Sequence, residues 1–197
     1  MDKLTCFKAY DIRGKLGDEL NTDIAYRIGR AFAQHTKAKK VVVGGDIRLT
    51  SEALKLALAN GLMAGGADVI DIGLCGTEEV YFATTYLKAN GGIMITASHD
   101  PKNYNGMKIV REKSQPINND TGLDEIKRIV ASTETLSRKR HGRSIHLSVT
   151  PQYTEHILNS INVNKLKQLR LVVNAGNGVA GHVIDDIETM FASENVP

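Results

Sequence analysis

The sequence contains little cysteine: Cys6 and Cys75 are the two thiols among its 197 residues. Their separation matches none of the short spacings that hold structural zinc, and two thiols do not make a disulfide scaffold. We therefore expect both cysteines to be reduced side chains that pack in the protein interior.

The sequence also lacks long apolar runs and a large excess of one charge. No run approaches the roughly 20 apolar residues that cross a bilayer, and the amino terminus has neither a secretory nor a transit pattern. Lysine and arginine (25) nearly balance aspartate and glutamate (22), for a formal net charge of +3. Because basic and acidic residues are interspersed, we expect neither nucleic acid nor a membrane as a partner, and we expect a cytoplasmic location.

What the sequence does contain is an alternation of helix-type and strand-type patterns. Apolar residues recur at helical spacing in several segments, and short apolar runs lie between these segments. Such strands suit a sheet buried on both faces, so the predicted fold class is α/β, with a mixed, mostly parallel sheet covered by helices. A first helix is expected to begin at Asn21 or Thr22, and further helices are expected over 51–64, 78–87, 123–130, 153–161 and 179–191. The expected strands cover 41–43, 68–72, 92–96, 107–110 and 169–173.

The composition changes in residues 131–144, which are rich in Ser, Thr, Lys and Arg and include Arg138, Lys139 and Arg140. Such a segment can contact polyanions, but a solvated connection between domains is the expected role. We predict a first domain over residues 1–145 and the start of a second α/β domain over 146–197. One strand with one or two helices leaves backbone groups unpaired, so the second domain is expected to be incomplete.

The most informative stretch follows the expected strand 92–96, where Thr-Ala-Ser-His-Asp-Pro places Ser98 and His99 at the end of the strand. The carboxyl ends of strands are where ligands bind in open α/β sheets. A serine there can act as a nucleophile or a phosphate carrier, with His99 and Lys108 supplying proton transfer or positive charge. The alternative is a Ser/Asp turn that simply ends the strand.

Three further clusters have weaker signals. Arg13 precedes Gly14, and a planar guanidinium beside a close-approaching backbone suits a phosphate. Asp46 and Arg48 follow an expected strand and are interpreted first as an ion pair that fixes a loop, with a functional role as the alternative. Residues 175–181 match the G-x-G-x-x-G pattern of dinucleotide sites, but no following strand carries the companion acid, so a tight turn is favoured.

Taken in order, the segments 8–14, 44–48, 96–101 and 105–109 resemble the first domain of the α-D-phosphohexomutase family. The resemblance extends over roughly the first domain predicted above, and residues 4–14 look most like the bacterial phosphomannomutases that feed GDP-mannose synthesis. Members of the family interconvert sugar 1- and 6-phosphates through a phosphoserine, a bisphosphate intermediate and Mg²⁺. The implied activity is the interconversion of mannose 6-phosphate and mannose 1-phosphate, with a phosphoglucomutase of the same family as the alternative.

The resemblance also implies roles for particular residues. Ser98 would be the phosphoserine and, through its phosphate, a ligand of Mg²⁺, which prefers oxygen. Arg13 and Lys108 would stabilise the transferring phosphoryl group or assist proton transfer, and His99 is the neighbour of the phosphoserine. Tyr10, Arg13 and Lys108 would bind the phosphosugar substrate.

Two departures from the family pattern affect these expectations. Asp100 stands where the family usually has asparagine, and its charge would repel a phosphate unless magnesium or Lys102 offsets it. The family's metal loop, sugar-selecting loop and distal phosphate pocket have no counterpart in the sequence. We therefore expect this chain alone to be inactive, as part of a longer enzyme. The remaining alternative is a non-catalytic module that binds phosphosugars or a partner chain through an open sheet edge, and the oligomeric state stays open.

Overall fold

A computed structural model of the chain describes residues 4–132, 140–162, 165–166 and 170–193. In these ranges six strands form one sheet in the order β1-β5-β4-β2-β3-β6. β2 runs parallel to β3 and β4, and β3 runs parallel to β6, whereas β5 is antiparallel to β1 and β4. The prediction of a mixed, mostly parallel sheet is confirmed. The strands are β1 (Ile12–Lys15), β2 (Lys40–Gly45), β3 (Asp68–Leu74), β4 (Gly91–Ile95), β5 (Tyr104–Arg111) and β6 (Ser144–His146).

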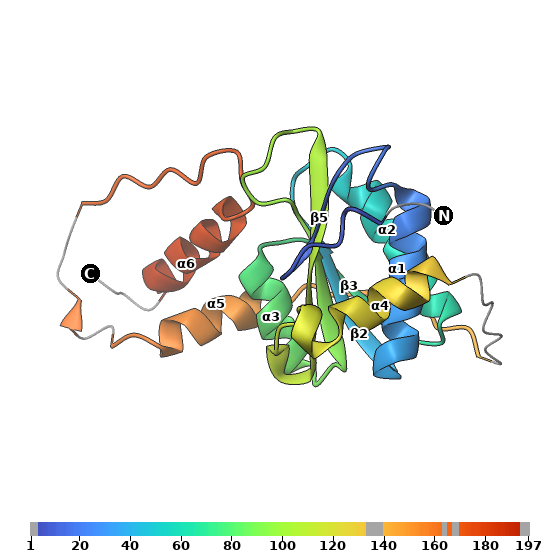
Figure 1. The fold of residues 1–197 in the computed structure, drawn as a ribbon. Helices are drawn as coiled ribbons and strands as arrows, with labels where there is room; N and C mark the ends of the chain where they lie inside the picture. The colour runs from blue at the N-terminus through green and yellow to red at the C-terminus, as the bar shows by residue number, and fades with distance from the viewer. Residues whose placement is uncertain (1–3, 133–139, 163–164, 167–169, 194–197) are drawn as a thin grey trace.

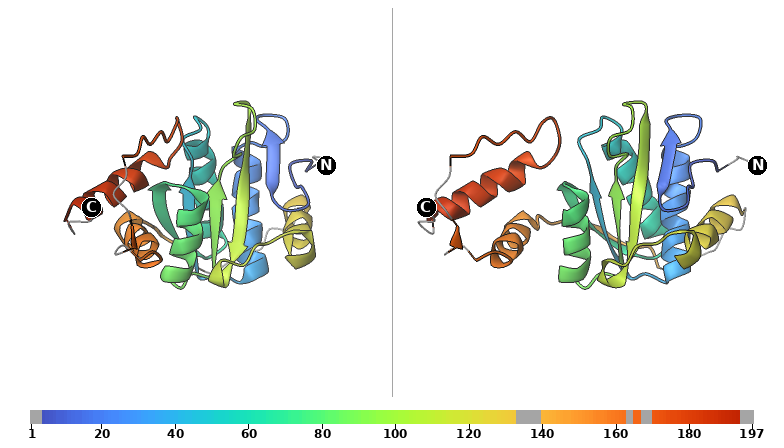
Figure 2. Two further views of the ribbon diagram at one scale, coloured as in Figure 1. Left: turned by 90° about the vertical axis from the view of Figure 1, so that its left-hand side faces the viewer. Right: turned by 60° about the vertical axis from the view of Figure 1, so that its left-hand side comes forward.

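Helices cover both faces of this sheet, as expected for the α/β class. Figure 1 shows α1, α2 and α4 on one face and α3 on the other, and the two views of Figure 2 agree. Each predicted helix is present; α2 has the predicted bounds, and the ends of the others differ by no more than a few residues. The helices are α1 (Thr22–Thr36), α2 (Ser51–Ala64), α3 (Thr77–Tyr86), α4 (Leu123–Ala131), α5 (Thr150–Asn159) and α6 (Gly181–Ser193).

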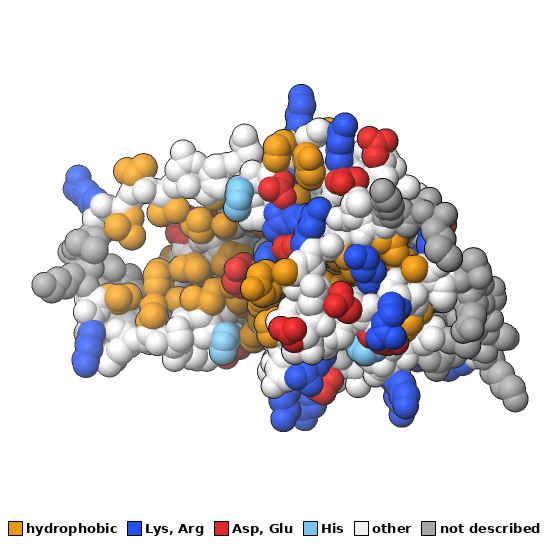
Figure 3. Space-filling model, viewed as in Figure 1, with side chains coloured by type: hydrophobic (Ala, Val, Ile, Leu, Met, Phe, Trp, Pro, Cys, Tyr) orange, Lys and Arg blue, Asp and Glu red, His pale blue; other side chains and the backbone are white. Residues whose placement is uncertain are grey.

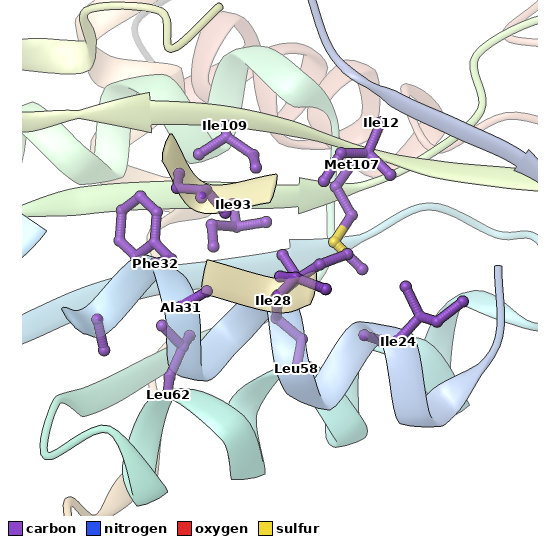
Figure 4. Packing of buried hydrophobic residues seen from close by; sticks show 14 of the residues in the cluster. Ile12, Ile24, Ile28, Ala31, Phe32, Leu58, Leu62, Ile93, Met107 and Ile109 are labelled. Atoms are coloured by element: carbon purple, nitrogen blue, oxygen red, sulfur yellow. The ribbon is translucent and has the colours of Figure 1, made fainter. Parts of the chain in front are cut away.

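The core consists of two layers because the strand side chains alternate between the faces. Val41 and Val43 of β2 belong to the larger cluster beneath α1, α2 and α4, whereas Val42 belongs to the smaller cluster beneath α3. Figure 4 shows the larger cluster, in which Phe32 and Leu58 approach strand residues such as Ile93. This packing fixes β2 beside β4, so the loops that follow these two strands begin next to each other.

The start of α1 and its contact with α2 explain how the helices are fixed. The side chain of Asn21 accepts a hydrogen bond of 3.0 Å from the backbone N–H of Ile24, which confirms the predicted cap. Gly29 and Gly61 lie where the helices meet, and a Cβ atom at Gly61 would collide with the carbonyl oxygen of Tyr26. The close contact holds α2, whose first residues adjoin the loop after β2.

Two strands have no counterpart in the sequence prediction. β1 has four residues and pairs with β5, and β6 has three residues and pairs with β3. Before β6, the guanidinium of Arg140 donates to both carboxylate oxygens of Asp68 at 2.7 Å and to the carbonyl of Gly66 at 2.8 Å. Arg140 and Ser144 are exposed, as a solvated segment requires, but these bonds and the pairing of β6 attach this end of the segment to the sheet. Its role as a connection between domains stays a prediction, and Arg138 and Lys139 lie outside the described residues.

The strand predicted at 169–173 is also wrong in its described part, since residues 170–173 form no strand. The side chains of Leu171 and Val172 are exposed, and within the described ranges no segment lies beside them as a pairing strand. Figure 3 shows hydrophobic side chains gathered on this left-hand part of the molecule, around α6 and the segment before it. The division at residue 145 stays a prediction, although β6 continues through His146.

Both cysteines are free and buried, as predicted. Burial raises the pKa of Cys6 to about 11 and raises that of Cys75 further. Among the helices of the described residues, none has the length and apolar character required to cross a membrane.

Candidate active site

Ser98 lies just beyond the carboxyl end of β4, in an exposed loop. Its φ of 53° is in the left-handed region, which a residue with a side chain rarely adopts. The hydroxyl of Thr96 accepts the backbone N–H of Ser98 at 2.9 Å, and Ser98 Oγ lies 3.3 Å from His99 Nδ1. The hydroxyl that the sequence singles out is therefore turned toward solvent, with an imidazole beside it.

Arg13 reaches this loop from β1, at the antiparallel edge of the sheet. Its Nη1 donates to the carbonyl oxygen of Ala97 at 2.6 Å and to Asp100 Oδ2 at 2.5 Å. Its Nε donates to Asp11 Oδ2 at 3.2 Å. The structure thus brings Arg13 to the two residues that flank the Ser98–His99 pair, and the two carboxylates hold its guanidinium in one orientation.

Lys108 lies on the same face of the sheet as Arg13. Arg13 pairs with Gly106 across the strands, and Lys108 follows two positions later on β5, where side chains return to the same face. Lys108 Nζ is 3.9 Å from Asp11 Oδ2, the oxygen that Arg13 also contacts. We name Asp11, Arg13, Asp100 and Lys108 the charge cluster, in which two cations face two carboxylates.

Tyr10 lies in the loop before β1, and its side chain is 79% exposed. Its role in substrate binding stays a prediction.

Asp100 has a different partner from those considered from sequence. Its ion pair is with Arg13 rather than with Lys102, and the hydrogen bond from Arg13 holds the pKa of the Asp100 carboxyl below its usual range. Sequence reasoning missed this pair because Arg13 and Asp100 are far apart along the chain. The signal that could have suggested it is the unusual carboxylate in a loop otherwise suited to phosphate.

Arg48 is the residue that sequence reasoning undervalued. The expected contact with Asp46 is present, with 3.6 Å between Arg48 Nε and Asp46 Oδ2. The ends of the guanidinium, however, donate to backbone carbonyls of the Ser98 loop. Arg48 therefore fixes a second loop as well as its own.

A cavity of about 950 Å³ opens beside Ser98. It is lined by the loop after β2, the Ser98 loop and residues 177–179, which come from the glycine-rich turn before α6. In that turn Gly176 has a φ of 63°, and the preceding segment is not a strand, so the dinucleotide interpretation lacks its supporting element. In the first turn of α6, His182 Nε2 lies 3.0 Å from Glu79 Oε1 of α3.

The described residues contain no group of three or more His, Cys, Asp or Glu side chains that could hold a metal ion. A phosphate on Ser98 would offer one oxygen ligand of the kind Mg²⁺ prefers. The described part of this chain could therefore supply one ligand of a magnesium site, through that phosphate, but not the complete set of ligands.

Comparison with known proteins adds to this geometry. Residues 4–137 match the family described as phosphoglucomutase/phosphomannomutase, alpha/beta/alpha domain I. A phosphomannomutase of Escherichia coli is 57% identical over 200 residues, which include 100% of this chain and 44% of that protein. A phosphomannomutase sequence from Klebsiella pneumoniae is 58% identical over 157 residues, 79% of this chain and 100% of that sequence.

Among solved structures, a phosphoglucomutase/phosphomannomutase family protein from Burkholderia thailandensis superimposes with a TM-score of 0.81 at 36% identity. The match covers 98% of this chain and 43% of that protein. The chain thus spans less than half the length of the first curated relatives it matches.

Proposed function

Because this chain belongs to the phosphoglucomutase/phosphomannomutase family, we propose that the full-length protein is a phosphomannomutase that uses Ser98 as its phosphoryl carrier. The substrates would be mannose 6-phosphate and mannose 1-phosphate, with a hexose bisphosphate as the intermediate. We further propose that it acts in the cytoplasm and supplies mannose 1-phosphate to GDP-mannose synthesis.

The observation that carries the proposal is the exposed Ser98 hydroxyl at the end of β4, with Arg13 bonded to the same loop. In the first half-reaction, the bond between phosphorus and Ser98 Oγ breaks, and a bond forms between phosphorus and a sugar hydroxyl. The sugar hydroxyl loses its proton, and Ser98 Oγ takes one up. In the second half-reaction, the other phosphoryl group of the bisphosphate moves to Ser98 Oγ with the opposite proton movements.

The charge cluster supports this chemistry through electrostatics. Phosphoryl transfer depends mainly on positioning and on stabilising the charge spread over the phosphoryl oxygens. Arg13 and Lys108 supply the positive charge, and Asp11 and Asp100 keep the guanidinium aimed at the Ser98 loop. His99, at 3.3 Å from Ser98 Oγ, is the candidate to accept or return the serine proton.

We propose Mg²⁺ as the cofactor, with one ligand from phosphorylated Ser98 and the others from outside the described residues. When bound, it would neutralise charge on the phosphoryl oxygens. The residues of this chain would hold the serine and the cations in place around that phosphate.

The proposal is tested with the full-length protein, mannose 1-phosphate and a hexose bisphosphate activator, with glucose 1-phosphate as the competing substrate. We expect turnover of the mannose compound and one phosphoryl group on the peptide that contains Ser98. The Ser98→Ala variant should show neither. Turnover that survives Ser98→Ala would reject Ser98 as the carrier, and a clear preference for glucose 1-phosphate would reject the mannose assignment.

A further inference from the structure

Arg48 lies in the loop between β2 and α2, at the wall of the cavity that Ser98 also lines. Its side chain is 15% exposed, and the neighbouring carboxylate of Asp46 is 14% exposed. A cation with so little access to solvent needs partners inside the protein.

Those partners are four backbone carbonyl groups of one loop. Nη2 donates to the carbonyl oxygens of Ser98 at 2.9 Å and of Asp100 at 2.6 Å. Nη1 donates to those of Pro101 at 2.9 Å and of Tyr104 at 3.1 Å. Each terminal nitrogen of arginine carries two N–H groups, so these four bonds use all of them.

This arrangement determines the conformation of Ser98. The peptide N–H of Ser98 is held by Thr96 Oγ1, and its carbonyl is held by Arg48. With both peptide groups fixed, the residue is kept at its unfavourable φ of 53°, and its exposed hydroxyl lies beside His99 Nδ1. Loss of the bond from Arg48 would remove the donor that holds the Ser98 carbonyl and would allow this peptide group to turn toward an extended backbone.

The loop that carries Arg48 is itself fixed to the sheet. Asp46 Oδ1 accepts the Arg48 N–H at 3.0 Å and the Ser51 hydroxyl at 2.6 Å. The side-chain amide of Asn105, in β5, donates to the hydroxyls of Thr50 and Ser51 at 2.9 and 3.1 Å. The guanidinium therefore has a rigid support on its own side.

We propose that Arg48 is a positioning residue, which holds the Ser98 loop in the conformation that presents the serine hydroxyl for phosphoryl transfer. The inference rests on the proposed role of Ser98. Arg48 itself does not bind the transferring phosphate, because its terminal N–H groups are occupied by carbonyls. A lysine at this position has the charge but has a single nitrogen with three donors, which cannot reach the four carbonyls.

The test compares Arg48→Lys and Arg48→Ala with Arg27→Lys in the full-length protein. Arg27 is the matched control, because its guanidinium also donates to a backbone carbonyl, that of Val130, but at the contact of α1 with α4. We expect kcat to fall by about 100-fold in Arg48→Lys, the loss typical of a small misplacement of a reacting group. KM should stay near the wild-type value, and added guanidinium ion should restore part of the kcat of Arg48→Ala. Wild-type kcat in Arg48→Lys, or a rise in KM that accounts for the whole loss, would overturn the proposal.

A second measurement separates this inference from the proposed function. In the isotope-labelled wild-type protein, the backbone chemical shifts of Ser98 should have the values typical of a positive φ. Arg48→Lys should abolish these values, whereas Arg27→Lys should retain them. If the wild-type enzyme shows no Ser98 phosphorylation, the proposed function fails, and the shifts alone decide the role of Arg48. Unchanged Ser98 chemical shifts in both Arg48 variants would overturn the proposed positioning role of Arg48.

Discussion

Replacement of Asp100 by asparagine removes one of the two carboxylates that hold Arg13. The change keeps the shape of the side chain and leaves an oxygen that can still accept a hydrogen bond. It removes a charge at 2.5 Å from Arg13 Nη1, in a pair whose side chains are 17% and 30% exposed. The substitution therefore isolates the electrostatic part of the contact.

The magnitude follows from the exposure of the pair. Two opposite unit charges 4 Å apart attract by about 1 kcal/mol in water and about 4 kcal/mol near a protein surface. Desolvation and lost side-chain entropy offset most of that attraction, and exposed pairs are worth about 0–1 kcal/mol net. We expect Asp100→Asn to lower the free energy of unfolding near neutral pH by no more than about 1 kcal/mol.

The difference in unfolding free energy between wild type and Asp100→Asn should become smaller as the pH falls. Arg13 lowers the pKa of Asp100 in the folded state, whereas the unfolded carboxyl titrates near its ordinary value of about 3.9. A lowered folded-state pKa gives a stability contribution that is present above the unfolded pKa and is lost as the pH falls through the folded pKa. The difference between wild type and Asp100→Asn should therefore be constant above about pH 5 and should shrink in more acid solution.

Urea denaturation of both proteins near pH 7 and near pH 3 measures this difference. Asp124→Asn, which changes an exposed aspartate at the start of α4, is the control for loss of a surface charge. A difference that stays the same at both pH values would refute the ion-pair explanation, because asparagine does not titrate. A stability loss of several kcal/mol near neutral pH would refute the estimate of its size.

Three further predictions concern the chain as a whole. Gly61→Ala should lower the free energy of unfolding by about 1–3 kcal/mol, because the added Cβ would strike the carbonyl of Tyr26; denaturant unfolding that matches wild type would show that α1 and α2 can separate without cost. Cys6 and Cys75 should react slowly with a thiol reagent at mildly alkaline pH until the protein unfolds, because burial raises both pKa values, and fast labelling of the folded chain would contradict their burial. The 197-residue chain alone should not convert mannose 1-phosphate, since its described residues offer no complete metal site, and turnover by it would contradict that expectation.

Much of the fold follows from patterns that are local in the sequence. The buried runs of β2 and β4 and the periodic apolar residues of α1 and α2 were sufficient to predict these elements. β1 and β6 could not be predicted in this way, because each is short and exists through pairing with a distant strand. Leu171 and Val172 show the reverse case, in which apolar residues typical of a strand have no described strand to pair with.

The candidate site also contains features that the sequence could predict and features that it could not. The position of Ser98 at the end of a strand could be predicted from sequence, because an apolar strand that ends in small and polar residues marks the edge of an α/β sheet. Its role as a phosphoserine came from the family resemblance and stays a prediction. The four bonds of Arg48 and the pair between Arg13 and Asp100 could not, because they join segments that approach each other only in the folded chain. Backbone carbonyls also carry no sequence signal, so an arginine that binds them looks like any other loop cation.

The most direct test of Ser98 as the phosphoryl carrier is mass analysis of the Ser98 peptide after the full-length protein is mixed with a hexose bisphosphate. We predict one phosphoryl group on Ser98 that is lost when mannose 1-phosphate or mannose 6-phosphate is added. A phosphoryl group on another residue, or an unmodified Ser98 in an enzyme that turns over, would contradict it.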